Sequence, residues 1–567
     1  MDTESRDHLR QAIIDEIGSL EASTRALKSR LNELVPISRL PFEVLAATFS
    51  FLPVFTWNEG SGVLAWIYVA HVCRRWRETA LNHPHFWSHI NFTKLTPVGM
   101  AEILSRTKTV PLHLEVDSYK WNMEHTDCFG KQLEAHISHT RHLRFSGRYL
   151  STVESVVNRL VSPTSSLESL SLTISIYESS YAIPDNLFNC TAPSLTTLEL
   201  RHCDISWKSP LLKGLRILKI HGLSPKARPE LNDWLDALNE MPQIKELYLQ
   251  SATPVAPLVE PLISRTVMLP SLTYFRIDAS AKDCALALAH LLLPTLTRLR
   301  VDVESHDQAG EDVLLMIPHV IRNVCVLQDI EPIQSILIGG GRKCTEVGTW
   351  TTPGADVKVC VLDTLDDMSH SACFLFVATG DRWNYGVDTA IFDALLTLFP
   401  INSVSTLTVR NRTRLSKEFW LRHAPRWPLL EQARLASGAV RAFWEMLAED
   451  APSGSPRFPS LTKLILHNVT LNALKSYHLC NMLIKRMKQG VPLECAEVVV
   501  DGQDPSDERQ MMTVAFSNLH RGSECDNEAE FDDRQVSWCW YTDSSDDEDG
   551  DESEDGDEID YASDGGQ

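Results

Sequence analysis

The first periodic segment of the chain spaces its apolar residues by alternating steps of four and three. These positions are Ile13, Ile17, Leu20, Thr24, Leu27, Leu31 and Leu34. The spacing is a heptad seam, so we predict an amphipathic helix over residues 1–35. Two interpretations stay open, because a seam this short is near the lower limit for a stable coiled coil. The helix forms a homodimer through residues 13–34, or it packs against the protein's own body.

Two short helices are predicted next. The first begins at Pro41, whose fixed φ suits a first helical turn, and ends before Pro53. Its apolar stripe consists of Val44, Leu45, Thr48, Phe49 and Leu52. The second runs over residues 65–81 with a stripe of Val69, Val72, Cys73, Trp76 and Ala80, while Arg74, Arg75 and Arg77 are expected to stay solvated. Helices this small cannot bury a large core alone, so we expect the module to dock against another surface.

After Trp87 an apolar phrase of the form Leu-x-x-Leu-x-Leu recurs. Copies begin at Leu167, Leu195, Leu215, Ile244, Leu272 and Leu296, and later at Val404, Leu430 and Leu461. The copies in the first run start 28, 20, 29, 28 and 24 residues apart, which is the period of leucine-rich repeats. Each phrase predicts a short strand, and helices are predicted between phrases at 231–241, 282–293, 388–398 and 439–447. Stacked strand–helix units bury the apolar face that one unit cannot bury alone.

The repeat signature is weak over residues 304–400. Segments 335–338, 357–362 and 373–378 still have the composition of strands. We interpret this region as degenerate repeats with loop insertions, and a separate domain is the alternative.

The helical module resembles the F-box. The likeness is carried by Leu40-Pro41-Phe42-Glu43-Val44-Leu45, by Phe49 and Leu52, and by Val72-Cys73-Arg74-Arg75-Trp76-Arg77 with Trp87 beyond it. The whole chain resembles fungal F-box proteins with a leucine-rich-repeat-like C-terminal region. In that family the F-box docks on the adaptor Skp1 of a cullin-RING ubiquitin ligase, and the rest of the chain selects the target.

The resemblance implies a set of adaptor-binding residues. These are Leu40, Pro41, Glu43, Val44, Leu45, Phe49, Leu52, Val72, Cys73 and Trp76. Phe49 and Trp76 have a second interpretation as the internal core of the module, because buried aromatic residues stabilise small domains. Glu43 has one too, as first-turn charge that complements the helix dipole.

The predicted architecture is therefore mixed α/β. Residues 1–35 form a helix, 36–92 an all-α F-box, 93–530 an irregular leucine-rich-repeat-like α/β solenoid, and 531–567 a disordered acidic tail. The tail is expected to be disordered because residues 543–567 contain 13 acidic residues and no Lys or Arg.

The charge distribution and the cysteine usage limit the partners and the cellular compartment that we expect for this protein. The net charge is −22, and removing residues 543–567 leaves 62 acidic against 53 basic residues, so the body carries −9 and no basic stripe. Nucleic-acid binding is therefore not expected. The 13 cysteines are scattered, which is typical of a reducing compartment rather than of disulfides or zinc sites. The longest apolar run, near 285–293, is too short to cross a bilayer, so we expect an intracellular protein, cytoplasmic or nuclear, without membrane contact.

No catalytic constellation stands out in the sequence. Gly339-Gly340-Gly341-Arg342 lacks the spacing of a phosphate-binding loop, and the 20 histidines include no His-Glu-x-x-His. We therefore expect no enzymatic activity, no cofactor and no metal site. The predicted function is that of a substrate-recognition subunit of an SCF-type ubiquitin ligase, which binds Skp1 through the F-box and an unknown protein target through the repeats. A non-catalytic scaffold outside any ligase is the alternative, and a hydrolase with convergent titratable groups is a third possibility.

Overall fold

The computed structural model describes most of the chain up to residue 499. The described residues are 3–52, 65–175, 180–257, 265–304, 309–328, 332–340, 344–353, 373–379, 385–410, 413–449, 454–467, 485–486, 488–491 and 493–499. The chain divides into two compact units, which are Met1–Glu331 with Ala372–Asp381, and Pro332–Ser371 with Arg382–Gln567. The predicted acidic tail, the predicted strand at 357–362 and the C-terminal end of the predicted solenoid lie outside the described residues.

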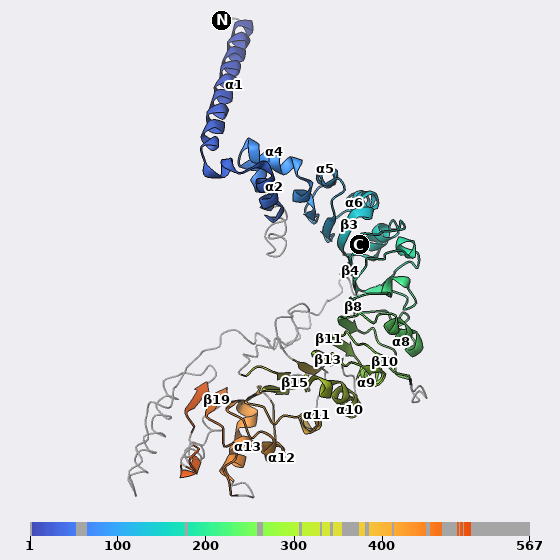
Figure 1. Ribbon diagram of the computed structural model, residues 1–567, viewed down its shortest axis with the longest axis vertical. Helices are drawn as coiled ribbons and strands as arrows, with labels where there is room; N and C mark the ends of the chain where they lie inside the picture. The colour runs from blue at the N-terminus through green and yellow to red at the C-terminus, as the bar shows by residue number, and fades with distance from the viewer. Residues whose placement is uncertain are drawn as a thin grey trace, which may run out of the picture. The chain divides into compact units, whose positions relative to one another are not determined.

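The first unit begins with one long helix, α1 (Thr3–Glu33) (Figure 1). The helix predicted over residues 1–35 is therefore present. The apolar residues of its heptad seam are between 49% and 74% exposed, from Ile13 to Leu34. The interpretation in which this seam packs against the protein's own body is wrong for the described part of the chain.

The helical module follows as a series of short elements. They are the 3₁₀ helix η1 (Pro36–Arg39), α2 (Phe42–Ser50), the 3₁₀ helix η2 (Ala65–His71), α4 (Arg74–Asn82) and the 3₁₀ helix η3 (Pro84–Trp87). The single helix predicted over residues 65–81 is wrong, because Cys73 is extended with φ −154° and separates η2 from α4. Its sulfur accepts a hydrogen bond from the Trp76 backbone N–H at 3.5 Å, so Cys73 caps α4.

Beyond the module, parallel strands pair one after another. In spatial order they are β1 (His89–Asn91), β2 (Leu112–Asp117), β3 (Thr140–Gly147), β4 (Ser169–Ile174), β6 (Thr197–Arg201), β8 (Ile217–His221), β9 (Glu246–Gln250), β11 (Tyr274–Ala279), β13 (Arg298–Glu304) and β16 (Phe374–Thr379). Two small parallel pairs accompany them, β5 (Tyr181–Ala182) with β7 (Cys203–Asp204) and β10 (Val267–Met268) with β12 (Leu291–Leu292). Strands therefore occur at every copy of the phrase in the first run, as predicted.

The apolar positions of the phrase stay in register along this sheet. One row reads Leu170, Leu198, Leu218, Leu247, Phe275 and Leu299, and the next reads Leu172, Leu200, Ile220, Leu249, Ile277 and Val301. All twelve side chains are buried. Because the strand–helix units repeat at this period, each apolar side chain inside a row lies between those of the two neighbouring strands. The stacked units therefore bury the apolar face that a single unit would leave exposed.

Helices connect the strands and lie along one side of them (Figure 1). They are α5 (Pro97–Thr107), α6 (Met123–His136), α7 (Leu150–Val157), α8 (Leu231–Asn239), α9 (Ala281–Ala289) and α10 (Ala309–Gln328), with 3₁₀ turns η4 (Ile137–His139), η5 (Leu187–Cys190) and η6 (Pro210–Leu212). The helix predicted over 282–293 is shorter than expected, because Leu291 and Leu292 form β12.

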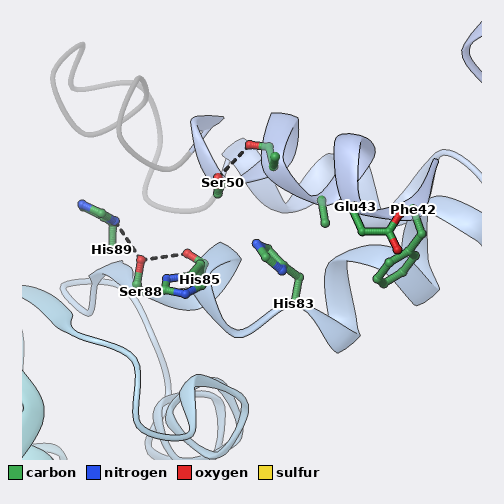
Figure 2. A pocket seen from close by; sticks show the side chains of 9 residues that line it. Phe42, Glu43, Ser50, His83, His85, Ser88 and His89 are labelled. Carbon is green, nitrogen blue, oxygen red and sulfur yellow. Dashed lines mark hydrogen bonds between the residues drawn. The ribbon is translucent and has the colours of Figure 1, made fainter. Parts of the chain in front are cut away.

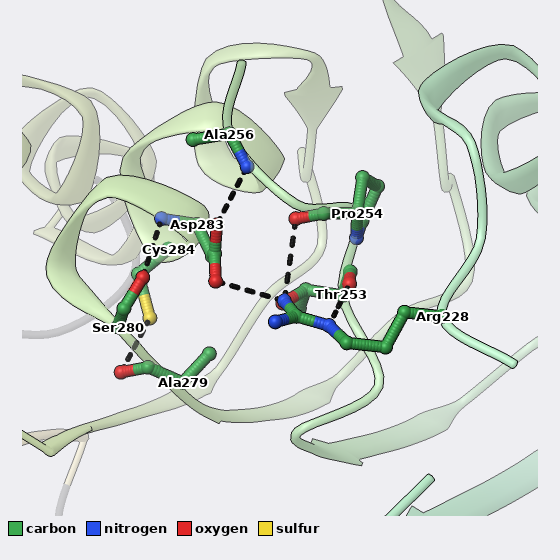
Figure 3. A network of polar contacts seen from close by, with 8 residues as sticks. All are labelled: Arg228, Thr253, Pro254, Ala256, Ala279, Ser280, Asp283 and Cys284. Carbon is green, nitrogen blue, oxygen red and sulfur yellow. Dashed lines mark hydrogen bonds and ion pairs between the residues drawn. The ribbon is translucent and has the colours of Figure 1, made fainter. Parts of the chain in front are cut away.

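A polar network ties α9 to the segments that precede it (Figure 3). The Asp283 carboxylate accepts hydrogen bonds from Arg228 Nη2 at 2.8 Å and from the Ala256 backbone N–H at 2.6 Å. Arg228 Nε also donates to the Thr253 carbonyl at 3.0 Å, and Ser280 caps the helix at the Asp283 N–H. Asp283 is buried, so its charge is stabilised by this fixed set of donors rather than by water.

The second unit starts with an antiparallel pair, β14 (Ser335–Gly340) with β15 (Cys344–Trp350). β14 also pairs in parallel with β17 (Thr406–Val409), followed by β18 (Gln432–Ala436), β19 (Lys463–His467) and β20 (Cys495–Val499). The connecting helices are α11 (Tyr385–Leu398), α12 (Lys417–His423), η7 (Ala424–Arg426) and α13 (Ser437–Ala448). The fading repeat signature thus coincides with a change from parallel to antiparallel pairing.

Candidate protein-docking surface

The core of the helical module is aromatic. The Phe49 ring lies 5.1 Å from that of Trp76 and 6.0 Å from that of Phe86, measured between centroids. Leu45 and Phe49 are only 1% and 2% exposed, and Trp87 Nε1 donates to the Ala80 carbonyl at 2.9 Å. Of the two interpretations of Phe49, internal core is therefore the one that the structure bears out, and Leu45 shares that role.

The buried face of α2 differs from the predicted stripe. Leu45, Ala46 and Phe49 point inward, whereas Val44 and Thr48 are exposed. α2 packs against both α4 and η3, and Phe49 contacts Trp76 of α4 and Phe86 of η3. The spacing of Val44, Leu45, Thr48 and Phe49 fits one helical stripe, so spacing alone does not decide which of these side chains face inward.

Arg75 has a structural role that the sequence did not indicate. Its guanidinium donates to the backbone carbonyls of Ser38 and Leu40, so it holds η1 and the start of α2 against α4. Arg77 Nε donates to the Ala70 carbonyl at 2.9 Å. The expectation that these arginines are solvated holds for Arg74, which pairs with exposed Glu78, and for Arg77, which is exposed despite this contact, whereas Arg75 is half-buried.

The module has several exposed apolar side chains. Ile37, Phe42, Val44, Phe51, Tyr68 and Val72 are between 40% and 72% exposed. Single exposed apolar residues are normal, but several on one small module indicate a surface that another molecule covers.

The ten residues predicted to bind an adaptor divide by burial. Pro41, Glu43, Val44 and Val72 are exposed, and Leu40, Leu52, Cys73 and Trp76 are half-buried. Leu45 and Phe49 are buried in the core of the module. Phe42 and Tyr68 are also exposed, although neither was among the ten predicted residues, and only their exposure identifies them.

A hollow of about 530 Å³ lies beside this surface (Figure 2). α2 contributes Phe42, Glu43, Ala46, Ala47 and Ser50, and the opposite wall consists of His83, His85, Ser88 and His89. Ser88 Oγ donates to the His85 carbonyl at 2.7 Å and lies 3.0 Å from His89 Nδ1. Burial lowers the pKa of His83 and of His89, so both rings favour the neutral form. The hollow therefore combines apolar lining from Phe42, Ala46 and Ala47 with two neutral histidine rings and one exposed carboxylate, Glu43.

The strand face opposite the buried leucines carries polar rows. At its start the rings of His89, His113 and His142 stack at 4.0 and 4.3 Å between neighbours. Burial, with smaller repulsion from His89 and His142, lowers the pKa of His113 to about 3. These rings are neutral near pH 7 and act as a stacked aromatic ladder rather than as a cationic patch.

A second polar group lies further along the same face. Arg276 Nε donates to Asp302 Oδ2 at 2.7 Å, and the guanidinium stands 4.7 Å above the Tyr248 ring. The His221 ring lies 4.2 Å from that of Tyr248, and Arg300 also pairs with Asp302. Burial lowers the pKa of His221 to about 3 and raises the pKa of the Tyr248 hydroxyl. The charged members Arg276, Arg300 and Asp302 are paired with one another, whereas the buried Tyr248 hydroxyl has no hydrogen-bond partner among the described residues.

No metal site or membrane span emerges from the described residues. Within them, no group of three or more His, Cys, Asp or Glu side chains is arranged to hold a metal ion. None of the described helices combines the length and apolar character needed to cross a bilayer.

The fold and this surface define a class: a small helical docking module followed by a mixed α/β body with N-terminal helices and a mostly parallel sheet. Residues 37–93 match the family model of the F-box-like domain, so the chain contains an F-box-like domain. No curated protein matches the chain. Among solved structures, a chain of the Rad7 and Elc1 complex in yeast is similar over 83% of this chain and 94% of its own length, with 12% identity. The TM-score of that pair is 0.27, which is too low to carry an argument.

Proposed function

We propose that this protein is the substrate-recognition subunit of an SCF-type ubiquitin ligase. The F-box-like domain binds a Skp1-type adaptor, and through it a cullin. The strand–helix array is an irregular leucine-rich-repeat-like solenoid that holds a target protein. The protein itself carries out no chemistry. It acts by proximity, because a target held on the array meets the ubiquitin-charged conjugating enzyme at high effective concentration. Its place of action is intracellular, in the cytoplasm or the nucleus.

One observation carries the proposal. Leu45, Phe49 and Trp87 are buried in the core of the F-box-like domain, whereas Phe42, Val44 and Val72 are exposed. A module that has closed its core gains nothing from these side chains by itself, whereas an adaptor that covers them removes apolar area from water. The neighbouring hollow between α2 and η3 offers a place for a side chain of the adaptor.

The experiment is retention of a Skp1-type adaptor by the full chain. Val44→Glu/Val72→Glu places two charges on the exposed apolar surface without touching the core, and we expect retention to fall at least a hundredfold. Val98→Glu is the matched control, because Val98 on α5 is 80% exposed and lies outside residues 37–93. Full retention by the double variant would contradict the proposal.

The second candidate is an interaction scaffold outside any ligase, in which the F-box-like domain only caps the array. The same retention assay separates the two functions. The scaffold is favoured if the unmodified chain retains no adaptor and if Leu40→Ala/Pro41→Ala leaves its binding of other proteins unchanged.

A further inference from the structure

The seam of α1 has no partner in the described structure. Its apolar residues Ile13, Ile17, Leu20, Leu27, Leu31 and Leu34 are all exposed, and α1 contacts η1 at its C-terminal end. We propose that α1 pairs with α1 of a second copy of this chain as an antiparallel coiled coil. The proposal is independent of the proposed ligase function, because none of these residues belongs to the F-box-like domain.

The heptad positions favour the antiparallel direction. With Ile17, Thr24 and Leu31 at a positions and Ile13, Leu20, Leu27 and Leu34 at d positions, Arg10 also falls at an a position. In a parallel pair Arg10 would face Arg10 of the second copy inside the seam, and Thr24 would face Thr24. In the antiparallel pair each a position faces a d position, so Thr24 meets Leu20 and Arg10 meets Leu34 at the rim.

The register is the one that pairs seam residues 13 to 31 of one copy with those of the other. When Thr24 faces Leu20 of the second copy, Ile17 faces Leu27 and Leu31 faces Ile13, so no apolar seam residue from 13 to 31 is left without an apolar or threonine neighbour. Moving the register by one heptad toward the C-terminus would place Ile13 opposite Ser38, beyond the end of α1. The first register therefore keeps every seam residue from Ile13 to Leu31 paired within the length of α1.

The flanking charges support the same arrangement. A parallel pair brings Glu16 of each copy next to Glu21 of the other, which gives two like-charge contacts. The antiparallel register brings Glu16 next to Arg30 of the second copy, twice by symmetry. Its one like-charge contact is between the two Glu21 side chains, and Arg25 lies 4.0 Å from Glu21 within each helix. Charge complementarity thus selects the antiparallel dimer.

The arrangement has a consequence for the F-box-like domains. Glu33 is 11 residues from the centre of the overlap at position 22, so the two α1 C-termini stand about 33 Å apart along the coiled-coil axis at 1.5 Å per residue. Because η1 begins at Pro36, the two F-box-like domains leave the coiled coil at opposite ends. Each is then free to bind its own adaptor.

Sedimentation equilibrium of the full chain tests the proposal through charge reversal. Glu16→Lys turns both Glu16–Arg30 contacts into like-charge contacts, so the dimer Kd is expected to rise on the order of tenfold. Arg30→Glu is expected to do the same, and Glu16→Lys/Arg30→Glu to restore the original Kd. Glu21→Lys is the matched control, because it replaces one like-charge contact by another and leaves the Kd within about twofold.

Three results would overturn the antiparallel dimer. A tighter dimer with Glu16→Lys indicates the parallel direction, and an unchanged Kd indicates another register. A chain that stays monomeric at all concentrations, or that stays dimeric with Leu20→Glu/Leu27→Glu, shows that this seam has a different occupant or none. Unchanged hydrogen exchange in residues 37–93 of the same variants reports that the F-box-like domain is still folded.

Discussion

The F-box-like domain and the parallel strand array of the same unit differ in how they bury their apolar side chains. The array places its leucines in rows, where Leu200 and Leu249 each find neighbours in the strands on both sides. The helical domain closes a small aromatic core around Phe49 and leaves Val44 and Val72 outside. An array extends its core by adding units, whereas this small helical domain cannot, so its exposed apolar residues indicate a partner.

The largest effect is expected for the core of the helical domain. Phe49→Ala removes the ring that contacts both Trp76 and Phe86, at a cost of about 3–5 kcal/mol, which exceeds what so small a domain can lose. Hydrogen exchange should then show residues 37–93 opening while the strands of the array stay protected. Phe51→Ala is the matched control, because Phe51 is exposed and its loss should cost less than about 0.5 kcal/mol. Equal effects of the two changes would contradict the described core.

The next effect is expected at the buried polar network of the array, around α9. Arg228→Ala leaves buried Asp283 without its cation and should weaken the local stability around α9 by about 2–4 kcal/mol. Arg265→Ala removes a pair with Asp236 on the surface and should cost less than about 1 kcal/mol. Local hydrogen exchange of residues 281–289 measures both, and similar values would show that the network has no special role.

A third effect depends on pH and concerns the array. Burial lowers the pKa of His221 to about 3 from its usual 6.5, so between these values the unfolded chain binds a proton that the folded array does not. Stability is therefore expected to fall as the pH drops from 6.5 toward 3, by up to about 1.4 kcal/mol per pH unit for this group. His221→Phe should make the pH dependence of exchange in β8 and β9 shallower. A steeper dependence in the variant would contradict the burial of a neutral ring.

The sequence predicted the array better than the helical domain. Paired residues such as Leu198 and Leu218 belong to copies of one recurring phrase, so each copy supports the strand assignment of the others. The break at Cys73 was missed because Val72, Cys73 and Trp76 also fit a continuous helical stripe, and only the extended φ of Cys73 separates them. The anchoring role of Arg75 and the hollow beside α2 were missed as well, since both depend on backbone carbonyls and loop positions that carry no side-chain pattern.

The antiparallel pair of β14 and β15 was missed for a related reason. Ser335 to Ile338 has the composition of a repeat strand, and composition does not record the direction of the neighbouring strand. In contrast, the exposure of the α1 seam could not be decided from the heptad pattern, because the same spacing serves a helix that packs on its own protein. That choice depends on which surfaces the rest of the chain leaves free.

The central claim is that the exposed apolar residues of the F-box-like domain form the adaptor surface. Hydrogen exchange of the full chain, with and without a Skp1-type adaptor, tests it most directly. We expect new protection in Phe42–Phe51 and Tyr68–Cys73, and none in the strands from β4 to β13. Protection confined to those strands, with Phe42–Phe51 exchanging as in the free chain, would contradict the account.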